Sequence, residues 1–282
     1  MSNYFAIVTC RNSENNIRDA LSSLKEQTLS AEYVIVINDG SSDNTGNILY
    51  DFQKKWHNLL VITHQDRGYD IKRIVKNWNE AIKLTQDKNF DETTYHFIAT
   101  DDTIYPKYYA EKMVEFMDSN HQVAIISGNY TKYRSLTPHG TGRFIRNSFF
   151  EKSRWHGYYP EQIGYESALL YEANRCGYSY SVLNNIKFKH TRNLGTNHKF
   201  YEYGVSMRTL GYYPFFVIAR FLNCLLTGKA VGRKGAFYML YYYLTYNPKS
   251  YGYDSMYSED FRQYVSKIQR DRLKKIICKM KQ

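Results

Sequence analysis

The sequence predicts an α/β protein with a mostly parallel central sheet flanked by helices and a helical C-terminal extension. Two observations lead to this prediction. Over residues 4–127, short apolar segments alternate with amphipathic segments, which is typical of strands covered on both faces by helices. From residue 196 onward, dense Tyr and Phe with Lys and Arg replace the strand pattern. We therefore expect a first domain over 1–195, with halves at about 1–127 and 128–195, and a Tyr-rich basic region over 196–282.

The elements of the first half follow one another in order. Apolar runs predict strands over residues 4–9, 33–39, 59–64, 95–99 and 123–127. Helical spacing of apolar residues predicts helices over 13–28, 44–56, 71–85 and 108–117. Ser13 is the expected N-cap of the first helix, ahead of an apolar stripe that begins at Ile17. The segment 129–159 is expected to be a long loop.

The C-terminal region predicts helices. Two aromatic apolar stretches cover 201–228 and 233–246, and a third segment follows a Ser258 cap. The third segment has one apolar face and one face of Lys and Arg; its apolar positions are Phe261, Val265, Ile268, Ile276 and Met280. Such a helix either lies on an anionic membrane or packs on the protein body, and the sequence leaves both open. No apolar run reaches about 18 residues, so no membrane-spanning helix is expected.

Charge and cysteine content indicate the kind of binding partner and the cellular compartment. The net charge is +11 and the pI is about 9.2, which indicates an anionic partner such as nucleic acid, an anionic membrane or a phosphorylated substrate. The four cysteines are scattered without zinc-site spacing, which favours a reduced cytosolic setting. The N-terminal residues are too polar for a signal peptide and match a first strand. We therefore expect a cytoplasmic location.

Polar residues follow each of the first four predicted strands. They lie at 9–12, 38–43, 64–68 and 101–102. In parallel sheets, ligands bind beyond the carboxyl ends of the strands, so these clusters are expected to line one cleft. The adjacent carboxylates Asp101 and Asp102 have a simpler interpretation as a turn or helix cap.

Five segments in order resemble the signature segments of family 2 glycosyltransferases, which have the GT-A fold. They are AIVTCRNSENNIRDALSSLKEQT, VIVINDGSSDNT, NEAI at 79–82, FIATDDTIYP and GYESALLYEANRCGY. The likeness covers roughly the first 190 residues. It implies an inverting, metal-dependent hexosyltransferase that uses a nucleotide-diphosphate sugar, with UDP favoured over GDP. The implied acceptor is a glycan or a lipid-linked hydroxyl, in glycan or polysaccharide synthesis.

The resemblance also implies a metal site. Asp102 is the expected ligand of Mn²⁺ or Mg²⁺, and Asp101 touches the ribose or shares the metal. Many relatives carry another Asp two positions before Asp101; here that residue is Ala99, so fewer protein oxygens are available. His190 stands where some GT-A enzymes supply a further ligand, with an ordinary strand histidine as the alternative.

The nucleotide pocket implied by the resemblance consists of Thr9, Arg11, Asp39, Asp43, Gly68, Arg73 and Asp101. Asp39 resembles the residue that accepts the imide N–H of the base, which favours uracil without excluding guanine. Arg11 stands where relatives often have Tyr, and Arg73 is a candidate for the diphosphate. The simpler alternatives are a loop cap for Asp43, a turn for Gly68 and a solvated helix charge for Arg73.

An inverting transfer needs a base that takes the proton of the acceptor hydroxyl. Aligning Gly164 and Gly177 with the family pattern puts Tyr165 and Glu166 at its acidic pair. Glu166 is therefore the predicted base, and Glu161 is the reserve candidate. The alternative for Glu166 is an acid favoured by the dipole of a helix N-terminus.

The expected loop over 129–159 resembles the acceptor-side loop of the family, with Trp155 and His156 as candidate acceptor contacts; a flap without substrate role is the alternative.

The sequence is also compatible with two other classes of protein. The departures at Ala99 and Tyr165 suggest a nucleotide-sugar-binding protein without turnover. Charge alone suggests a nucleic-acid-binding protein, but no reading module is recognisable, so nucleic acid is not an expected partner. The expected partners are the sugar donor, the acceptor and, through the basic C-terminal helix, an anionic membrane.

Overall fold

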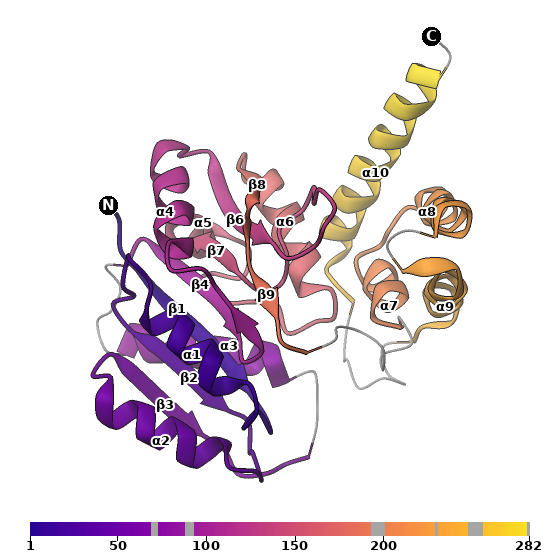
Figure 1. Cartoon of the computed structure of the whole chain (residues 1–282). Helices are drawn as coiled ribbons and strands as arrows, with labels where there is room; N and C mark the ends of the chain where they lie inside the picture. The colour runs from indigo at the N-terminus through magenta and orange to yellow at the C-terminus, as the bar shows by residue number, and fades with distance from the viewer. Residues whose placement is uncertain (69–72, 88–92, 193–200, 229–230, 248–255, 281–282) are drawn as a thin grey trace. The chain divides into compact units, whose positions relative to one another are not determined.

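The computed structural model describes residues 1–68, 73–87, 93–192, 201–228, 231–247 and 256–280 (Figure 1). The chain forms two compact units. The first unit comprises Met1–Pro160 and Glu172–Asn193, and the second comprises Glu161–Tyr171 and Leu194–Gln282. The helix α6 (Tyr165–Arg175) contributes residues to both.

A seven-stranded sheet forms the centre of the first unit, in the order β3-β2-β1-β4-β7-β6-β8. The strands are β1 (Tyr4–Cys10), β2 (Val34–Asn38), β3 (Leu59–Thr63), β4 (Tyr95–Thr100), β6 (Val123–Asn129), β7 (Arg143–Arg146) and β8 (Ser179–Lys187). Strands β1 to β4 pair in parallel, β6 pairs in parallel with β8, and β7 runs antiparallel to both of its neighbours. The predicted mostly parallel sheet flanked by helices is confirmed.

The helices of the first unit lie between these strands in sequence. They are α1 (Ile17–Lys25), α2 (Thr45–Lys55), α3 (Arg73–Asp87), α4 (Tyr109–Ser119) and α5 (Asn147–Lys152). The predicted N-cap at Ser13 is wrong, because α1 begins at Ile17 and Asn16 occupies the cap position. The Ser13 carbonyl accepts the backbone N–H groups of Asn16 and Ile17, and its hydroxyl bonds elsewhere.

The predicted loop over 129–159 is wrong in part, since it contains β7 and α5. Strand β7 fits between β4 and β6 although its sequence, RFIR, carries two arginines. Arg146 is nevertheless buried, because its guanidinium donates to the carbonyl oxygens of Met117 at 2.7 Å and Val123 at 3.2 Å. A buried arginine satisfied by carbonyl groups does not show up as an apolar run, so the strand could not be predicted by pattern.

The core of the first unit is largely aromatic. Phe97 on β4 stacks on Phe144 of β7 with ring centroids 4.5 Å apart, and Tyr4 and Tyr109 pack around this pair. All four rings are almost completely buried. Stacked and tilted rings of this kind add to the stabilisation from buried area. They fix β1 and β4 side by side, and these two strands carry the polar residues discussed below.

The second unit is helical, as predicted. Its helices are α7 (Tyr201–Thr209), α8 (Pro214–Thr227), α9 (Gly232–Thr245) and α10 (Glu259–Met280), besides the first turns of α6. The stretch 201–228 is two helices instead of one, because Gly211 takes a left-handed φ of +70° and Pro214 starts α8. No helix in the described part of the chain is both long and apolar enough to cross a bilayer.

The first half of α10 packs on its own unit. Phe261, Val265 and Gln269 are fully buried, and the Gln269 amide accepts from the Tyr213 backbone and donates to the Tyr171 hydroxyl. For this half of α10, packing against the protein body is therefore the correct alternative. The side chains of Ile276 and Met280 lie outside the described residues.

Candidate functional site

The carboxyl ends of β1, β2 and β4 lie next to one another. The parallel register pairs Thr9 with Thr100 and Cys10 with Asn38, so the residues that follow these strands emerge at one edge of the sheet. Asp39 directly follows β2, and Asp101 directly follows β4. The fold therefore places the predicted polar clusters together, as parallel pairing requires.

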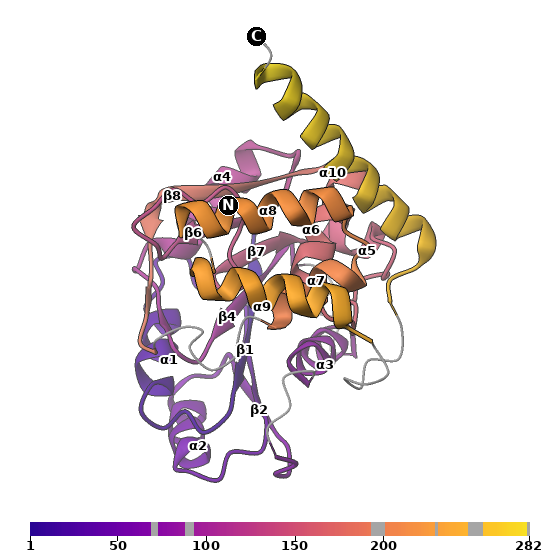
Figure 2. The same cartoon turned by 90° about the vertical axis from the view of Figure 1, so that its right-hand side faces the viewer.

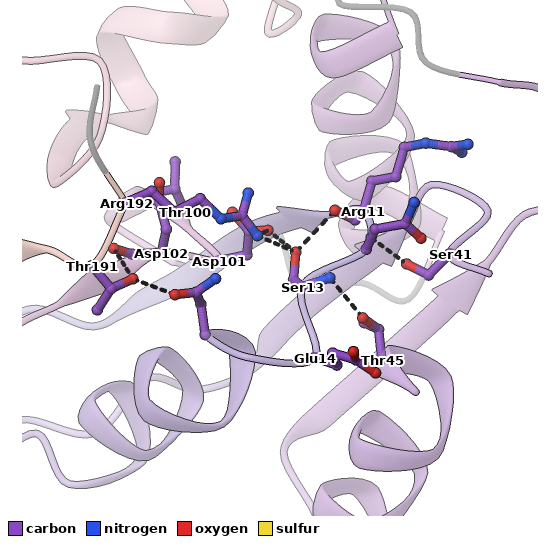
Figure 3. Close-up of polar contacts among 12 residues, drawn as sticks. Arg11, Ser13, Glu14, Ser41, Thr45, Thr100, Asp101, Asp102, Thr191 and Arg192 are labelled. Carbon is purple, nitrogen blue, oxygen red and sulfur yellow. Dashed lines mark hydrogen bonds and ion pairs between the residues drawn. The ribbon is translucent and has the colours of Figure 1, made fainter. Parts of the chain in front are cut away.

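Asp101 is buried against two partners from distant segments (Figure 3). Its Oδ2 accepts a hydrogen bond from the Ser13 hydroxyl and another, at 3.2 Å, from Arg192. Arg192 also donates to Ser13 Oγ at 2.9 Å, which closes a three-residue cluster. Burial raises the pKa of Asp101, and the charge of Arg192 and the Ser13 hydrogen bond partly offset that rise.

Asp102 has a different environment. Its Oδ1 accepts from the Thr100 hydroxyl at 2.8 Å and lies 3.5 Å from Nδ1 of His190. Burial alone would raise the pKa of Asp102, but the hydrogen bonds from His190 and Thr100 outweigh it and lower the pKa below its ordinary value. The two adjacent carboxylates thus have pKa values that move in opposite directions, with Asp102 the more readily ionised.

A short antiparallel pair of strands brings His190 to Asp102. In it, β5 (Thr103–Ile104) pairs with β9 (Lys189–His190), and Thr103 stands opposite His190. His190 Nδ1 lies 3.1 Å from the Thr103 hydroxyl, and the Tyr130 ring packs edge-on against the imidazole at 4.7 Å. Within the described residues, Nε2 of His190 is buried without a hydrogen-bond partner.

These donors fit a divalent cation held by few protein ligands. A carboxylate and an imidazole nitrogen suit Mn²⁺ and, for the oxygen, Mg²⁺, with phosphate oxygens completing the shell. The two candidate ligand atoms, Asp102 Oδ1 and His190 Nδ1, lie 3.5 Å apart and are close enough to share one ion. Among the described residues there is no group of three or more His, Cys, Asp or Glu side chains that could hold a metal. Any metal here would therefore rely on the substrate for most of its ligands.

A second polar cluster surrounds the end of β2. Arg11 donates to the carbonyl oxygens of Asp39 at 2.5 Å and Gly40 at 3.0 Å, and to Asp66 Oδ1 at 2.7 Å. The Arg11 hydrogen bond lowers the pKa of Asp66. Gly40 has a φ of +68°, and a Cβ there would meet the Gln65 carbonyl oxygen at 2.6 Å, so only glycine fits this turn.

Arg73 connects this cluster to α3. Its guanidinium forms a two-pronged contact with the Asp39 carboxylate and donates to the Gly68 carbonyl. Gly68 is exposed, has a φ of +74° and donates its N–H to Asp66 at 2.8 Å. The structure therefore brings together four of the predicted pocket residues: Arg11, Asp39, Gly68 and Arg73.

Two further predicted pocket residues have distinct surroundings. Thr9 Oγ1 is buried at the end of β1 and has no hydrogen-bond partner within the described residues. Asp43 accepts from the backbone N–H of Thr45 at 3.0 Å and of Glu14 at 3.1 Å, which makes it a loop cap at the start of α2. Burial opposes ionisation of Asp43, but the hydrogen bonds from Thr45 and Glu14 lower its pKa overall.

Sequence reasoning missed Ser13, Thr103 and Arg192 as members of these clusters, whereas Asp66 lies in the predicted cluster 64–68. Ser13 was assigned to a helix cap, and a threonine or an exposed-looking arginine carries no pattern of its own. Arg192 touches residues 91 and 179 positions away in the chain. Only the β5–β9 pairing, which brings the segment around residue 190 to the segment after β4, reveals it.

The predicted base belongs to the second unit. Glu166 is half-buried in the first turn of α6, two residues after Gly164, whose φ is +89°. Burial raises the pKa of Tyr203 on α7, and the negative charge of Glu166 adds to that rise. The reserve candidate Glu161 is exposed in the same unit. Trp155 and His156 belong to the first unit, where His156 is exposed with a φ of +50°.

Comparison with known sequences identifies a family. The profile described as glycosyl transferase family 2 matches residues 5–185. The poly-beta-1,6-N-acetyl-D-glucosamine synthase of Staphylococcus epidermidis is 29% identical over 125 residues, which is 44% of this chain and 27% of that synthase. The match thus spans about a quarter of the length of this curated relative.

Comparison with solved structures identifies the fold. TarS of S. aureus, crystallised in complex with UDP, superposes with a TM-score of 0.54 at 19% identity and covers 73% of this chain and 63% of its own. The mannosyltransferase PcManGT from Pyrobaculum calidifontis, in complex with GDP-Man and Mn²⁺, gives a TM-score of 0.58 at 15% identity. The match covers 88% of this chain and 72% of PcManGT. The fold is that of the GT-A enzymes.

Proposed function

The chain belongs to glycosyl transferase family 2, and we propose that it is an inverting, metal-dependent hexosyltransferase. It transfers a sugar from a nucleotide-diphosphate sugar to an acceptor hydroxyl in glycan or polysaccharide synthesis. The observation that carries this proposal is the pair of carboxylates after β4, with Ser13 and Arg192 on Asp101 and Thr100 and His190 on Asp102. Carboxylates at the carboxyl end of a parallel strand suit an anionic donor when a divalent cation lies between them and the diphosphate.

UDP is favoured as the nucleotide. The structural relatives include TarS bound to UDP and to UDP-GlcNAc, which supports a UDP-sugar, and PcManGT bound to GDP-Man, which keeps GDP as the second candidate. On the protein, the Asp39 carboxylate is the acceptor for an N–H of the base. Arg11 and Arg73 supply the positive charge around it.

A divalent cation completes the donor site. Asp102 and His190 would hold Mn²⁺ or Mg²⁺, with Asp101 touching the ribose or sharing the ion. Bound there, the ion neutralises negative charge on the diphosphate that departs. Arg192 adds a fixed positive charge at Asp101. Because few protein groups contact the metal, its affinity is expected to depend on the nucleotide.

Glu166 is the proposed general base. The acceptor oxygen attacks the anomeric carbon, the bond from that carbon to the diphosphate oxygen breaks, and the hydroxyl proton passes to the Glu166 carboxylate. Glu166 lies in the first turn of α6 and is half-buried. Glu161 is the reserve, and Trp155 and His156 are proposed acceptor contacts.

A peripheral location on the cytoplasmic face of a membrane accompanies this proposal, with a lipid-linked acceptor as one option. The support is the exposed basic side chains of α10: Lys267, Arg270, Arg272, Lys274 and Lys275. Changing Lys267, Lys274 and Lys275 to Gln leaves the buried face of α10 intact and is expected to weaken binding to anionic vesicles at low salt. Unchanged vesicle binding would contradict the proposal that α10 contacts the membrane.

Calorimetric titration tests the donor site. UDP and GDP are titrated separately in Mn²⁺ and in EDTA; metal-dependent binding of UDP is expected, and absence of binding by either nucleotide contradicts the proposal.

Sugar transfer is then assayed with Asp102→Asn and Glu166→Gln. Both variants are expected to lose at least about 100-fold in kcat, whereas only Asp102→Asn weakens nucleotide binding. Binding without turnover of any UDP-sugar would favour the catalytically inactive alternative.

A further inference from the structure

The second unit exposes an unusually apolar surface on two neighbouring helices. We call it the α8–α9 apolar face; it consists of Phe215, Ile218, Leu222 and Leu226 on α8, and Phe237, Tyr238, Tyr241 and Leu244 on α9. Each of these side chains is at least 43% exposed, and Leu226 reaches 77%. Single exposed apolar residues are ordinary in proteins, but a contiguous group marks a contact surface.

The exposed residues of each helix lie on one side of it. At 3.6 residues per turn, the four residues of α8 fall within about 80° of arc, opposite the buried Val217 and Cys224. Phe237, Tyr241 and Leu244 of α9 fall within about 60°, and the other side of α9 is buried at Met239 and Tyr243. Both helices are therefore apolar on the inner and the outer side.

The two outer sides join into one surface. Helices α8 and α9 run side by side (Figure 2). The half-buried Phe221 of α8 meets the exposed Phe237 of α9 with ring centroids 5.3 Å apart. Phe221 is next to Leu222 in the chain and one turn from Ile218, so the ring contact connects the exposed sides of the two helices.

The sequence segment that contains this surface carries formal charges of one sign only. Residues 203–253 contain no Asp or Glu and six basic residues, Arg208, Arg220, Lys229, Arg233, Lys234 and Lys249. Arg233 and Lys234 are exposed in the first turn of α9, about one turn before Phe237 and Tyr238. An apolar centre with tyrosines, on a segment whose only charged residues are basic, matches an anionic lipid surface, where rings and aliphatic side chains enter below the headgroups.

We propose that the α8–α9 apolar face inserts into the headgroup region of an anionic lipid bilayer, with both helices lying in the plane of the membrane. At 14 residues each, α8 and α9 are too short to span the hydrocarbon core and long enough to lie on it. The inference is independent of the transfer reaction and names a different surface from the basic side of α10. A symmetric contact between two copies would bring like charges together, which disfavours a dimer through this face.

Vesicle flotation with the full chain tests the proposal. Wild type is expected to float with vesicles of phosphatidylcholine and phosphatidylglycerol, and to retain most of its binding at 0.5 M salt because insertion is apolar. The triple variant Leu222→Ser, Leu226→Ser and Phe237→Ser is expected to lower the partition coefficient about 100-fold or more. Each of these side chains is at least 48% exposed, and a wild-type circular dichroism spectrum is the check that the variant is folded.

The matched control is Tyr133→Ser with Leu136→Ser, since these side chains of the first unit are 72% and 79% exposed. The control is expected to bind vesicles like wild type. Wild-type-like binding by the triple variant, or no binding by wild type, overturns the proposal. A wild-type dimer that the triple variant converts to monomer, without vesicle binding by either, also overturns it and identifies a second copy as the occupant. None of these results depends on donor binding or turnover.

Discussion

Arg73 holds the carboxylate of Asp39 on both oxygens. Its Nε lies 2.9 Å from Oδ1, and one terminal nitrogen lies 3.0 Å from Oδ2. The side chains are only 15% and 12% exposed, so solvent screens this ion pair weakly. The sequence alone indicates two separate contacts with the nucleotide: Asp39 with the nucleobase and Arg73 with the diphosphate. Because Arg73 contacts both oxygens of Asp39, we expect it to orient the carboxylate that is proposed to bind the nucleobase.

Replacing Arg73 therefore predicts a loss of nucleotide affinity. Arg73→Gln is expected to weaken UDP binding about tenfold or more, because the Asp39 carboxylate loses both charged donors. Arg73→Lys is expected to recover only part of the loss, since an ammonium group cannot make the two-pronged contact. Calorimetry measures both values, with Arg18→Gln, an exposed arginine on α1, as the control. Tighter UDP binding by Arg73→Gln would mean that Arg73 competes with the nucleotide instead of orienting Asp39.

Arg192 is predicted to support the donor site through Asp101. It donates to both Asp101 and Ser13, and Arg192→Gln leaves the buried Asp101 carboxylate without its cationic neighbour. We expect UDP affinity in Mn²⁺ to fall about tenfold, with partial rescue by Arg192→Lys. The control is Arg18→Gln, an exposed arginine on α1. Equal affinities for wild type and Arg192→Gln would assign Arg192 a purely structural part.

His190 is predicted to bind the metal. His190→Gln is expected to lower Mn²⁺ affinity in the presence of UDP by about 10- to 100-fold, because one of few protein donors is lost. Electron paramagnetic resonance of free Mn²⁺ measures this affinity. Binding of UDP in EDTA is expected to stay unchanged. The exposed His57→Gln is the control. Wild-type Mn²⁺ affinity in His190→Gln would make His190 an ordinary strand histidine.

The parts of the fold that the sequence predicted are those with local patterns. Strands β1 to β4 and β6 are short apolar runs between amphipathic helices, and such patterns depend on few distant contacts. Strand β7 escaped prediction because it is four residues long and two of them are arginines whose charges are satisfied by carbonyl groups. The two-residue strands β5 and β9 have no pattern of their own.

In the candidate site, too, only the residues next to locally predictable strands could be predicted. Asp101, Asp102 and Asp39 follow predicted strands, so the rule for parallel sheets places them. Arg192 was not predictable, because its position depends on a pairing between segments 87 residues apart, Thr103 with His190. Ser13 is predicted at the cap position that Asn16 occupies, since a serine beside a helix has the same local sequence whether it caps the helix or bonds a distant carboxylate.

Close packing between α7 and α9 predicts a large loss of stability when Gly204 is replaced by a residue with a Cβ. A Cβ at this position would lie 2.3 Å from the Met239 carbonyl oxygen and 2.9 Å from Tyr242 Cβ. Gly204→Ala is therefore expected to destabilise the protein by about 1–3 kcal/mol through overpacking, despite the better helix propensity of alanine. The control is Gly46→Ala on α2, where the nearest atom is 4.0 Å away and no loss is expected. Thermal melting followed by far-ultraviolet circular dichroism compares them; equal melting temperatures would contradict the packing argument.

Burial of His96 predicts a pH dependence of stability. The imidazole lies between Asn147 at 2.6 Å and the Tyr159 hydroxyl at 2.7 Å, and burial lowers its pKa from 6.5 to about 4. The folded protein therefore keeps His96 neutral at pH values where the unfolded chain protonates it. Stability from this group is complete above pH 6.5 and is lost as the pH falls from 6.5 toward 4.

Between pH 7 and pH 5 this loss amounts to about 2 kcal/mol of unfolding free energy. His96→Gln retains polar partners for Asn147 and Tyr159 but cannot titrate, so the variant is expected to lose about 2 kcal/mol less than wild type over the same interval. His139, whose pKa burial also lowers to about 4, is present in both proteins and cancels in the difference. Urea unfolding at both pH values measures it, with the exposed His121→Gln as the control. Parallel pH profiles for wild type and His96→Gln would show that His96 protonates without penalty in the folded state.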